Sequence, residues 1–327
     1  MNHKILFVID KLELKYFEFN KLVTNFWLIK EFLQRDCDIW VTTIDKLGIS
    51  GAKAYCRCFK AYLKDENIYL KNHFETIEIE DFRLVIFRPD PPVDLDYINA
   101  TYVFDFVDRD KTLILNDTKS IRDFNEKLHA NLFNNLMPEN IVTSNQVEIE
   151  KFLEKNEEIV LKPLNLCFGS GVMYLKIGDK NIRSIINSMT NNQSTLIMVQ
   201  KYISNAQFGD KRILILGDEV LEECVTKLPS KDDFKFNNHS DEFIKKALLT
   251  DSERIKFKKV AKQLNSMGIF MAGLDVIDEK IIEINVTSPC YFIREINNYF
   301  SINLEEKIAD SIFNILESEK IKEFRLR

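Results

Sequence analysis

Glycine is scarce in this chain, with 9 among 327 residues. The first apolar run, at residues 4–10, is not followed by a G-x-G-x-x-G turn, so we expect no dinucleotide site there. No apolar run approaches the length of a membrane span, and no basic block or stripe occurs. Together with a net charge of −6, these absences argue against a membrane protein and against nucleic acid as the main partner.

The six cysteines do not show the paired spacing that predicts a disulfide framework. Cys56 and Cys58 are also too close together for the usual zinc ligands. Because the chain enters a strand pattern at once, we expect no signal sequence and a reducing, cytoplasmic location. The hydrophobic content of 45% and charged content of 29% are those of an ordinary globular protein, long enough for two or three domains.

The first third of the chain has the pattern of an α/β domain. The β-rich apolar runs 4–10 and 38–43 predict buried parallel strands, and apolar residues at helical spacing between positions 19 and 33 predict a helix joining them. This opening favours a doubly wound parallel-sheet domain. Residues 45–75 are mixed and polar, and we expect a loop-rich excursion there. Three further elements are predicted to complete the domain: a strand at 82–88, a helix at 97–107 and a strand at 113–115.

The pattern then changes to short strands alternating with helices, which indicates antiparallel α+β structure. The predicted strands span residues 159–164, 172–177, 196–202, 211–216 and 219–226. The predicted helices span residues 146–155, 181–190 and 251–266.

Residues 273–289 carry the most informative pattern. Two apolar runs flank the polar tripeptide 278–280, which predicts a tight antiparallel hairpin. Centring the turn on Glu279 places Asp275 directly opposite Glu283, and Asn285 shares the face of Glu283. Two carboxylates and an amide oxygen therefore project together from strands that are otherwise apolar.

Two interpretations of this face remain open. The three polar residues can simply line the wet side of a half-exposed hairpin, as in many antiparallel sheets. Alternatively, they bind a hard divalent cation such as Mg²⁺, which compensates buried carboxylates and prefers oxygen ligands.

Two lysines are candidates for holding an anion. Lys162 ends a buried apolar run, where an ammonium group needs a partner unless its head reaches water. The turn that contains Gly169 and Gly171 follows, and its backbone N–H groups could cradle phosphate oxygens. Lys127 lies at the predicted start of a helix, where the alternative is an ordinary solvated lysine.

Two arginines are candidates for holding a substrate carboxylate in a bidentate fork. Arg212 alternates with Asp210 on one face of a predicted strand, and Arg294 follows the hairpin. Surface ion pairing is the alternative for both arginines.

Seven segments, in order, resemble those of bacterial glutathione synthetases, which are members of the ATP-grasp superfamily. They read RPDPPVD (88–94), NATY (99–102), IRDFNEKL (121–128), LKPL (161–164), GDKR (209–212), GLD (273–275) and EINVTSP (283–289). The resemblance implies that ATP phosphorylates the cysteinyl carboxylate of γ-glutamylcysteine and that glycine then attacks the acyl phosphate. It also implies an ATP-grasp fold, in which two α+β subdomains clamp ATP, after the N-terminal domain.

The resemblance further implies a role for each matching position. Lys127 and Lys162 would hold the ATP phosphates, with Lys162 and Arg212 the catalytic residues. Adenine would meet the backbone of residues 200–203, which are Gln200, Lys201, Tyr202 and Ile203. Mg²⁺, or alternatively Mn²⁺, would be bound by Asp275, Glu283 and Asn285. The substrate contacts would be Asp210, Arg212, Lys235, Ser288 and Arg294.

The implied domains are a substrate-binding domain at 1–122, an ATP-grasp lid at 123–203 and a C-terminal subdomain with the metal site at 204–327. The implied partners are small molecules only, in a homo-oligomer expected to be a tetramer.

The chain departs from the family pattern at the loops that cover the site. Residues 165–171 and 241–244 lack glycines that the family has there, and Lys235 stands in place of an arginine. We therefore keep three hypotheses: a glutathione synthetase, a related ligase with another acceptor or peptide, and a nucleotide-binding member that has lost catalysis. The paired carboxylates and both lysines argue against the third.

Overall fold

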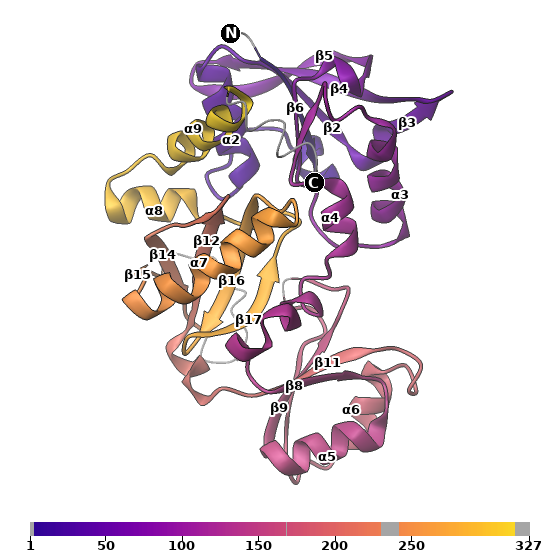
Figure 1. Cartoon of the computed structure of the whole chain (residues 1–327), viewed down its shortest axis with the longest axis vertical. Helices are drawn as coiled ribbons and strands as arrows, with labels where there is room; N and C mark the ends of the chain where they lie inside the picture. Colours follow the sequence, from indigo (N-terminus) through magenta and orange to yellow (C-terminus); the bar gives the residue numbers. More distant parts are fainter. Residues whose placement is uncertain (1–2, 168, 230–241, 318–327) are drawn as a thin grey trace.

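Three β-sheets follow one another along the chain in the computed structural model, which describes residues 3–167, 169–229 and 242–317. The first sheet lies at one end of the molecule, the second at the other end and the third between them (Figure 1). The sheets fall within residues 4–115, 140–201 and 210–285. Each lies inside one predicted domain, although the domain boundaries themselves stay predictions.

The first sheet has the order β3-β4-β2-β1-β6-β7, with β5 added beside β4. Strands β2, β1, β6 and β7 are parallel, as expected of a doubly wound domain, whereas β3, β4 and β5 form an antiparallel edge. Its strands are β1 (Lys4–Ile9), β2 (Asp38–Thr43), β3 (Leu47–Ser50), β4 (Lys53–Lys64), β5 (Asn67–Glu78), β6 (Leu84–Phe87) and β7 (Leu113–Leu115). Its helices are α1 (Lys11–Lys15), α2 (Thr24–Gln34), α3 (Leu95–Val103) and α4 (Thr118–Asp123). Helix α2 begins later than predicted, at Thr24, so Phe19 and Leu22 lie in the preceding turn.

The loop-rich excursion predicted for residues 45–75 is wrong, because β4 and β5 form a long antiparallel hairpin there. The turn residues Asp65 and Glu66 have φ angles of 49° and 62°, which two-residue hairpins of this kind require. On β5, residues 71–76 are all exposed, and such a strand has the composition of a loop. The hairpin could therefore not be predicted from the pattern of apolar residues.

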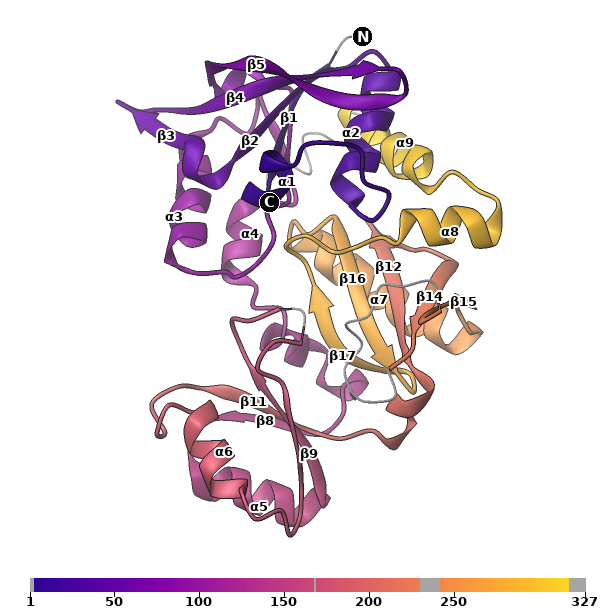
Figure 2. The same cartoon turned by 180° about the vertical axis from the view of Figure 1, so that it is seen from behind.

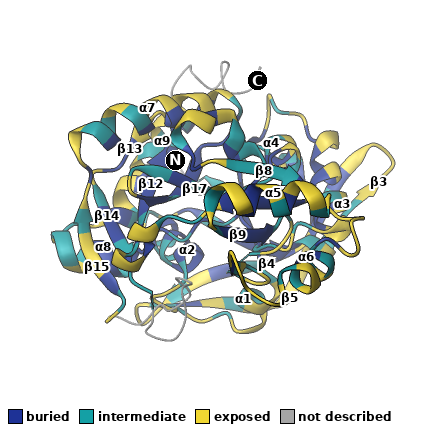
Figure 3. Ribbon diagram, turned by 90° about the horizontal axis from the view of Figure 1, so that it is seen from below, coloured by how far each residue is buried: buried dark blue, intermediate teal, exposed yellow. Residues whose placement is uncertain are grey.

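The second sheet is antiparallel, with the order β10-β9-β11-β8. Its strands are β8 (Asn140–Thr143), β9 (Glu158–Pro163), β10 (Met173–Lys176) and β11 (Ile197–Lys201). Helices α5 (Gln146–Asn156) and α6 (Ile182–Met189) cover one face, and they bury Ile149, Leu153 and Ile186 against the strands. In Figure 3 the outward side of α5 is exposed and the strands behind it are buried.

The third sheet is also antiparallel, with the order β15-β14-β12-β16-β17 and β13 beside β12. Its strands are β12 (Asp210–Leu216), β13 (Glu219–Val220), β14 (Glu223–Lys227), β15 (Ile244–Leu248), β16 (Met271–Ile277) and β17 (Lys280–Asn285). Strands β12 and β13 are joined by a two-residue turn at Gly217 and Asp218. Helix α7 (Asp251–Ser266) starts at a capping box formed by Thr250 and Glu253.

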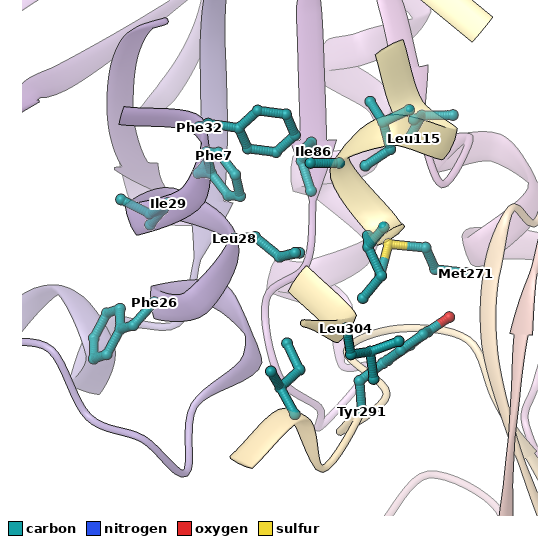
Figure 4. Packing of buried hydrophobic residues seen from close by; sticks show 14 of the residues in the cluster. Phe7, Phe26, Leu28, Ile29, Phe32, Ile86, Leu115, Met271, Tyr291 and Leu304 are labelled. Carbon is teal, nitrogen blue, oxygen red and sulfur yellow. The ribbon is translucent and has the colours of Figure 1, made fainter. Parts of the chain in front are cut away.

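The C-terminal helices return to the first sheet. Helices α8 (Ile293–Phe300) and α9 (Leu304–Glu317) follow the third sheet, and α9 lies beside α2 (Figures 1 and 2). Figure 4 shows the shared core, in which Phe7 and Phe32 lie in the same cluster as Met271, Tyr291 and Leu304. The two ends of the chain thus fix the third sheet against the first. Within the described residues, no helix is long and apolar enough to span a membrane.

Candidate active site

The hairpin of β16 and β17 turns at Asp278 and Glu279, whose φ angles are 53° and 59°. Two residues therefore form the turn, and the prediction of a turn centred on Glu279 is wrong. The first pairs after the turn are Ile277 with Lys280 and Val276 with Ile281.

A β-bulge then restores the predicted face. Ile282 is the extra residue, so Asp275 pairs with Glu283 and Gly273 with Asn285. Without the bulge Asp275 would oppose Ile282, and Glu283 would project from the other face. The predicted pairing of the two carboxylates is therefore confirmed, but through a compensating irregularity.

The hairpin faces a cavity of about 240 Å³ that lies between the second and third sheets and reaches the loop after β6. Its lining combines apolar residues, among them Val160, Val172 and Ile277, and the ring of Tyr202 with a larger set of charged residues. Of the predicted site residues, the following line it: Lys162, Gly169, Gln200, Lys201, Tyr202, Ile203, Asp210, Arg212, Asp275, Glu283, Asn285 and Ser288.

Cations hold the hairpin carboxylates. Glu283 Oε1 accepts a hydrogen bond from Lys127 Nζ at 2.9 Å, which brings that predicted lysine to the edge of the cavity. Asp275 Oδ1 lies 2.5 Å from Arg212 Nε and 3.6 Å from Lys227 Nζ. Burial alone would raise the pKa of Asp275, but the attraction of Arg212 and Lys227 outweighs it, and the pKa is lowered.

The residues on this face fit a magnesium ion whose remaining ligands are water and substrate phosphates. Within the described part of the chain, no three His, Cys, Asp or Glu side chains form a group that could hold a metal alone. The donor set consists of the carboxylates of Asp275 and Glu283 and the amide oxygen of Asn285, all lining one cavity. One or two carboxylates completed by water and substrate phosphates are typical of Mg²⁺. The donor chemistry fits an ion that arrives with a nucleotide.

Lys162, on β9, is buried beside the hairpin. Its Nζ donates to Gln200 Oε1 at 2.8 Å and to the carbonyl of the bulged Ile282 at 3.4 Å. Both acceptors are neutral, and burial lowers the pKa of Lys162 to about 8 despite the nearby charge of Glu283. This ammonium group is therefore incompletely compensated and faces the cavity.

The loop after Lys162 folds back over the cavity. The carbonyl of Leu166 accepts a hydrogen bond from Lys127 Nζ at 2.6 Å, and Gly169 lines the cavity. Gly171 lies outside the lining, at φ +69°, where an added Cβ would come within 2.9 Å of Pro163 Cγ. Gly171 therefore shapes the loop that positions Gly169.

A second group of buried charges also lines the cavity. Lys227 Nζ lies 3.0 Å from Asp210 Oδ2 and also pairs with Asp275, while Arg212 packs against Gly273. A Cβ at Gly273 would lie 3.1 Å from Arg212 Cδ, so glycine leaves room for this side chain. Burial raises the pKa of Asp210 to about 7 against the opposing attraction of Lys227.

The remaining predicted substrate residues are placed differently. Ser288 lines the cavity, as does Asp90, and it lowers the pKa of the Asp90 carboxyl against the larger effect of burial. Arg294 lies on α8, where its Nε donates to Glu295 Oε1 at 2.9 Å, and it is not part of the cavity lining. Lys235 and the first residue of segment 241–244 lie outside the described residues.

Models of two protein families match this chain in consecutive segments. The N-terminal domain of prokaryotic glutathione synthetase matches residues 3–122, and the ATP-grasp domain of prokaryotic glutathione synthetase matches residues 126–301. The chain belongs to the prokaryotic glutathione synthetase family. The resemblance inferred from the seven sequence segments is thereby confirmed.

Curated members of this family cover nearly the same length. The glutathione synthetase of Vibrio vulnificus strain YJ016 is 36% identical over 298 residues, which are 90% of this chain and 93% of that protein. The glutathione synthetase of Salmonella typhimurium is 31% identical over 291 residues, covering 88% of this chain and 92% of that protein.

Solved structures share the fold at low identity. D-cycloserine synthetase DcsG superposes with a TM-score of 0.65 at 12% identity, covering 96% of this chain and 100% of that one. The ATP-grasp ligase PsnB, in a complex with its minimal precursor, Mg and ADP, has a TM-score of 0.60 at 12% identity, covering 96% and 98%. The ATP-grasp fold expected from the sequence is confirmed.

Sequence reasoning missed three charged residues that line the cavity of this family member: Asp90, Glu126 and Lys227. Two of them could have been found from the sequence, since Asp90 and Glu126 lie inside the segments RPDPPVD and IRDFNEKL, which resemble the family. Lys227 carries none, because its role depends on the pairing of Asp210 with Lys227 between β12 and β14.

Proposed function

We propose that this protein catalyses the ATP-dependent ligation of γ-glutamylcysteine and glycine to glutathione, with release of ADP and phosphate. Its membership of the prokaryotic glutathione synthetase family supports the reaction. The observation that carries the assignment to a site is the convergence of Lys162, Lys127 and the hairpin carboxylates at one cavity. Phosphoryl transfer needs this combination of fixed positive charge and oxygen ligands.

ATP would lie with its adenine against the apolar residues of the cavity lining. Residues Gln200, Lys201, Tyr202 and Ile203 line the cavity where β11 ends, and their backbone would meet the adenine. The phosphates would extend toward Lys162 and Lys127. The backbone N–H groups near Gly169 would approach them from the loop.

Asp275, Glu283 and Asn285 would hold Mg²⁺, with Mn²⁺ as an alternative ion. When bound, the ion would neutralise charge on the phosphates. Lys127 would then exchange part of its contact with Glu283 for a phosphate oxygen, because both cations compete for the same carboxylate.

Arg212 would orient the carboxylate that is phosphorylated. Its Nε is occupied by Asp275, and the rest of the planar guanidinium remains to donate to a substrate oxygen. Asp210, Ser288, Lys235 and Arg294 are the further proposed substrate contacts. The residue ranges 1–122, 123–203 and 204–327 would act as the substrate-binding domain, the lid and the metal-bearing subdomain.

Phosphate release from ATP tests the function. The purified protein is assayed with Mg²⁺, γ-glutamylcysteine and glycine, and each substrate is omitted in turn. We expect turnover only when both amino substrates are present, with glutathione as the product. If turnover requires another amine in place of glycine, that amine is the acceptor and the protein is a related ligase. If nucleotide raises the melting temperature but no turnover occurs, the protein binds nucleotide without catalysing the reaction.

We also propose a homo-oligomer, a tetramer by family resemblance, located in the cytoplasm. All six cysteines are free thiols, which is the state a reducing compartment maintains. Light scattering coupled to gel filtration measures the number of chains directly.

A further inference from the structure

Lys162 and Gln200 are neighbours on two adjacent strands of the second sheet. Strand β11 pairs antiparallel with β9, and Gln200 lies opposite Val160. Lys162 is two residues further along β9, so it projects from the same face of the sheet and is a diagonal neighbour of Gln200. The alternate residues of both strands project from the other face, where they pack against α5 and α6. The face that carries Lys162 and Gln200 lines the cavity.

The contact between these two side chains is short and buried. Lys162 Nζ donates to Gln200 Oε1 at 2.8 Å, whereas its second acceptor, the carbonyl of Ile282, lies at 3.4 Å. Lys162 is 6% exposed and Gln200 is 2% exposed. The contact also fixes the amide, because the opposite orientation would place two N–H donors against each other. Gln200 Oε1 is therefore the main acceptor that determines where the ammonium group lies.

The stability of the fold does not explain why an amide is buried at this position. Gln200 Nε2 is buried and has no hydrogen-bond partner among the residues that the structure describes. A buried donor without a partner costs folding free energy, and an apolar side chain of similar size would avoid that cost. The contact with Lys162 provides a different reason for a glutamine here.

A neutral acceptor leaves the charge of Lys162 available to a ligand. Three carboxylates act on Lys162 through their charge, and each is already paired with another cation: Asp210, Asp275 and Glu283. The amide of Gln200 accepts a hydrogen bond from the ammonium group and does not neutralise it. A glutamate in the same place would form a buried ion pair with Lys162 and would compete with an anion in the cavity.

We propose that the side chain of Gln200 is a positioning residue, which holds the ammonium group of Lys162 toward the nucleotide phosphates without neutralising its charge. This role is separate from the backbone contact with adenine proposed for the same residue. The inference rests on the proposed function, because it takes the anion to be the phosphates of ATP. Gln200 should therefore act on nucleotide binding through Lys162 and not independently of it.

A double-mutant cycle in the full chain tests this dependence. Gln200→Met removes the acceptor with little change of volume, Lys162→Met removes the cation, and the two replacements are then combined. Calorimetry measures the Kd of a non-hydrolysable ATP analogue in the presence of Mg²⁺. We expect Gln200→Met alone to raise the Kd about 10-fold, which corresponds to the loss of a hydrogen bond to a charged group. In the Lys162→Met protein the same replacement should change the Kd by less than about twofold.

A merely structural role of Gln200 predicts a different result. Disturbed packing of β11, or a displaced backbone beside the adenine, would raise the Kd by the same factor whether or not Lys162 is present. Equal factors in the two backgrounds would overturn the proposal.

Gln200→Glu gives an independent measurement if the double variant does not fold or binds too weakly. The glutamate keeps an acceptor for Lys162 but neutralises it, so we expect the Kd to rise about 100-fold. The matched control is Asn140→Asp, because Asn140 pairs with Gln200 on β8, outside the cavity lining. This control makes the same charge change one strand away from Lys162 and should alter the Kd only slightly. A similar rise in both variants would show that added charge alone is responsible, and would overturn the proposal.

Failure of this inference and failure of the proposed function give different results. If wild type binds the analogue and both Gln200 variants bind it equally well, the positioning role is wrong and the proposed function stands. If wild type binds no nucleotide at all, the proposed function is wrong and the positioning role is wrong with it.

Discussion

Burial determines the chemistry of single residues at this site. Lys162 is a buried ammonium group whose two hydrogen-bond acceptors are neutral, and its pKa falls to about 8. A lysine in that condition costs folding free energy in the absence of ligand and binds an anion more strongly when one arrives. Under the proposed function, Lys162 therefore lowers folding stability and strengthens nucleotide binding.

Replacing Lys162 with Met should change how stability depends on pH. Below pH 8 the wild-type lysine is charged in both the native and unfolded states, and the burial penalty is fully present. As pH rises from 8 toward 10.5, the native state loses the proton first, so the penalty is relieved. A pKa lowered from 10.5 to about 8 corresponds to about 3 kcal/mol in unfolding free energy.

Urea unfolding at several pH values measures this effect. Wild type should gain stability relative to Lys162→Met as pH rises from about 7.5 to about 9.5. If the unfolding free energies of the two proteins depend on pH in the same way, the buried-charge interpretation is contradicted.

Glu283 should be indispensable for activity that depends on Mg²⁺. Glu283→Gln removes a charged oxygen ligand and leaves Lys127, which is 4% exposed, without its anionic partner. We expect turnover to fall by about 100-fold or more. Phosphate release measured over a range of Mg²⁺ concentrations checks this.

Glu279→Gln is the matched control, since Glu279 lies at the turn of the same hairpin and pairs with Lys256 and Ser252. Its exposed ion pair is worth little, so the control should keep wild-type activity. Wild-type activity in Glu283→Gln would remove the metal assignment.

At the scale of secondary-structure elements, the register of one hairpin decides which residues meet. The pattern of apolar runs at 273–289 was sufficient to predict the hairpin, although not its two-residue turn or the bulge at Ile282. A bulge cannot be read from alternation, because the extra residue is as apolar as its neighbours. The exposed hairpin of β4 and β5 was missed for the opposite reason, since its outer strand has few apolar residues.

Deleting Ile282 should remove the bulge without separating the two carboxylates. Val276 would still pair with Ile281, and Asp275 would pair with Glu283 at the next position, on the same face of the hairpin. We expect Mg²⁺-dependent turnover to be retained and the melting temperature to fall, because Lys162 loses the carbonyl of Ile282 as an acceptor. Ile282→Ala is the control, because it keeps the bulge and that carbonyl.

The assay compares Mg²⁺ dependence in the deletion and the control. Ile282→Ala should retain the wild-type Mg²⁺ dependence even if its KM for ATP rises, since Ile282 lines the cavity. A deletion variant without Mg²⁺-dependent turnover would show that the bulge itself, and not only the pairing of Asp275 with Glu283, is needed at the site.

At the scale of the whole molecule, the C-terminal helix α9 completes a core that begins at β1. Phe313 on α9 packs edge-on against Phe32 on α2 at 5.3 Å between ring centroids, and Arg35 pairs with Asp310 at 2.6 Å. These contacts join segments about as far apart in sequence as the chain allows. They hold the first sheet in place against the third, and thereby Asp90 against the hairpin of β16 and β17.

Ile312→Ala should destabilise the protein without changing the site. Ile312 is fully buried in the core that α9 shares with α2, outside the cavity lining. We expect a loss of about 2–5 kcal/mol in unfolding free energy, which is typical of such a cavity. Urea unfolding measures the loss, and the KM for ATP at a permissive temperature should remain unchanged. A comparable rise in KM would indicate that the core also positions the site.

The sequence by itself determined the family, the change from a parallel sheet to antiparallel structure and most of the charged residues that line the cavity. It could do so because the strands are apolar runs with regular spacing, and because the charged residues lie within short segments that resemble the family. Only the tertiary structure decided which charges compensate each other. Lys227 reaches Asp210 and Asp275 through strand pairing, whereas Asp90 and Glu126 come from segments far apart in sequence and have no counter-ion among the described residues. Ion pairing depends on distances across the fold, and local sequence does not contain them.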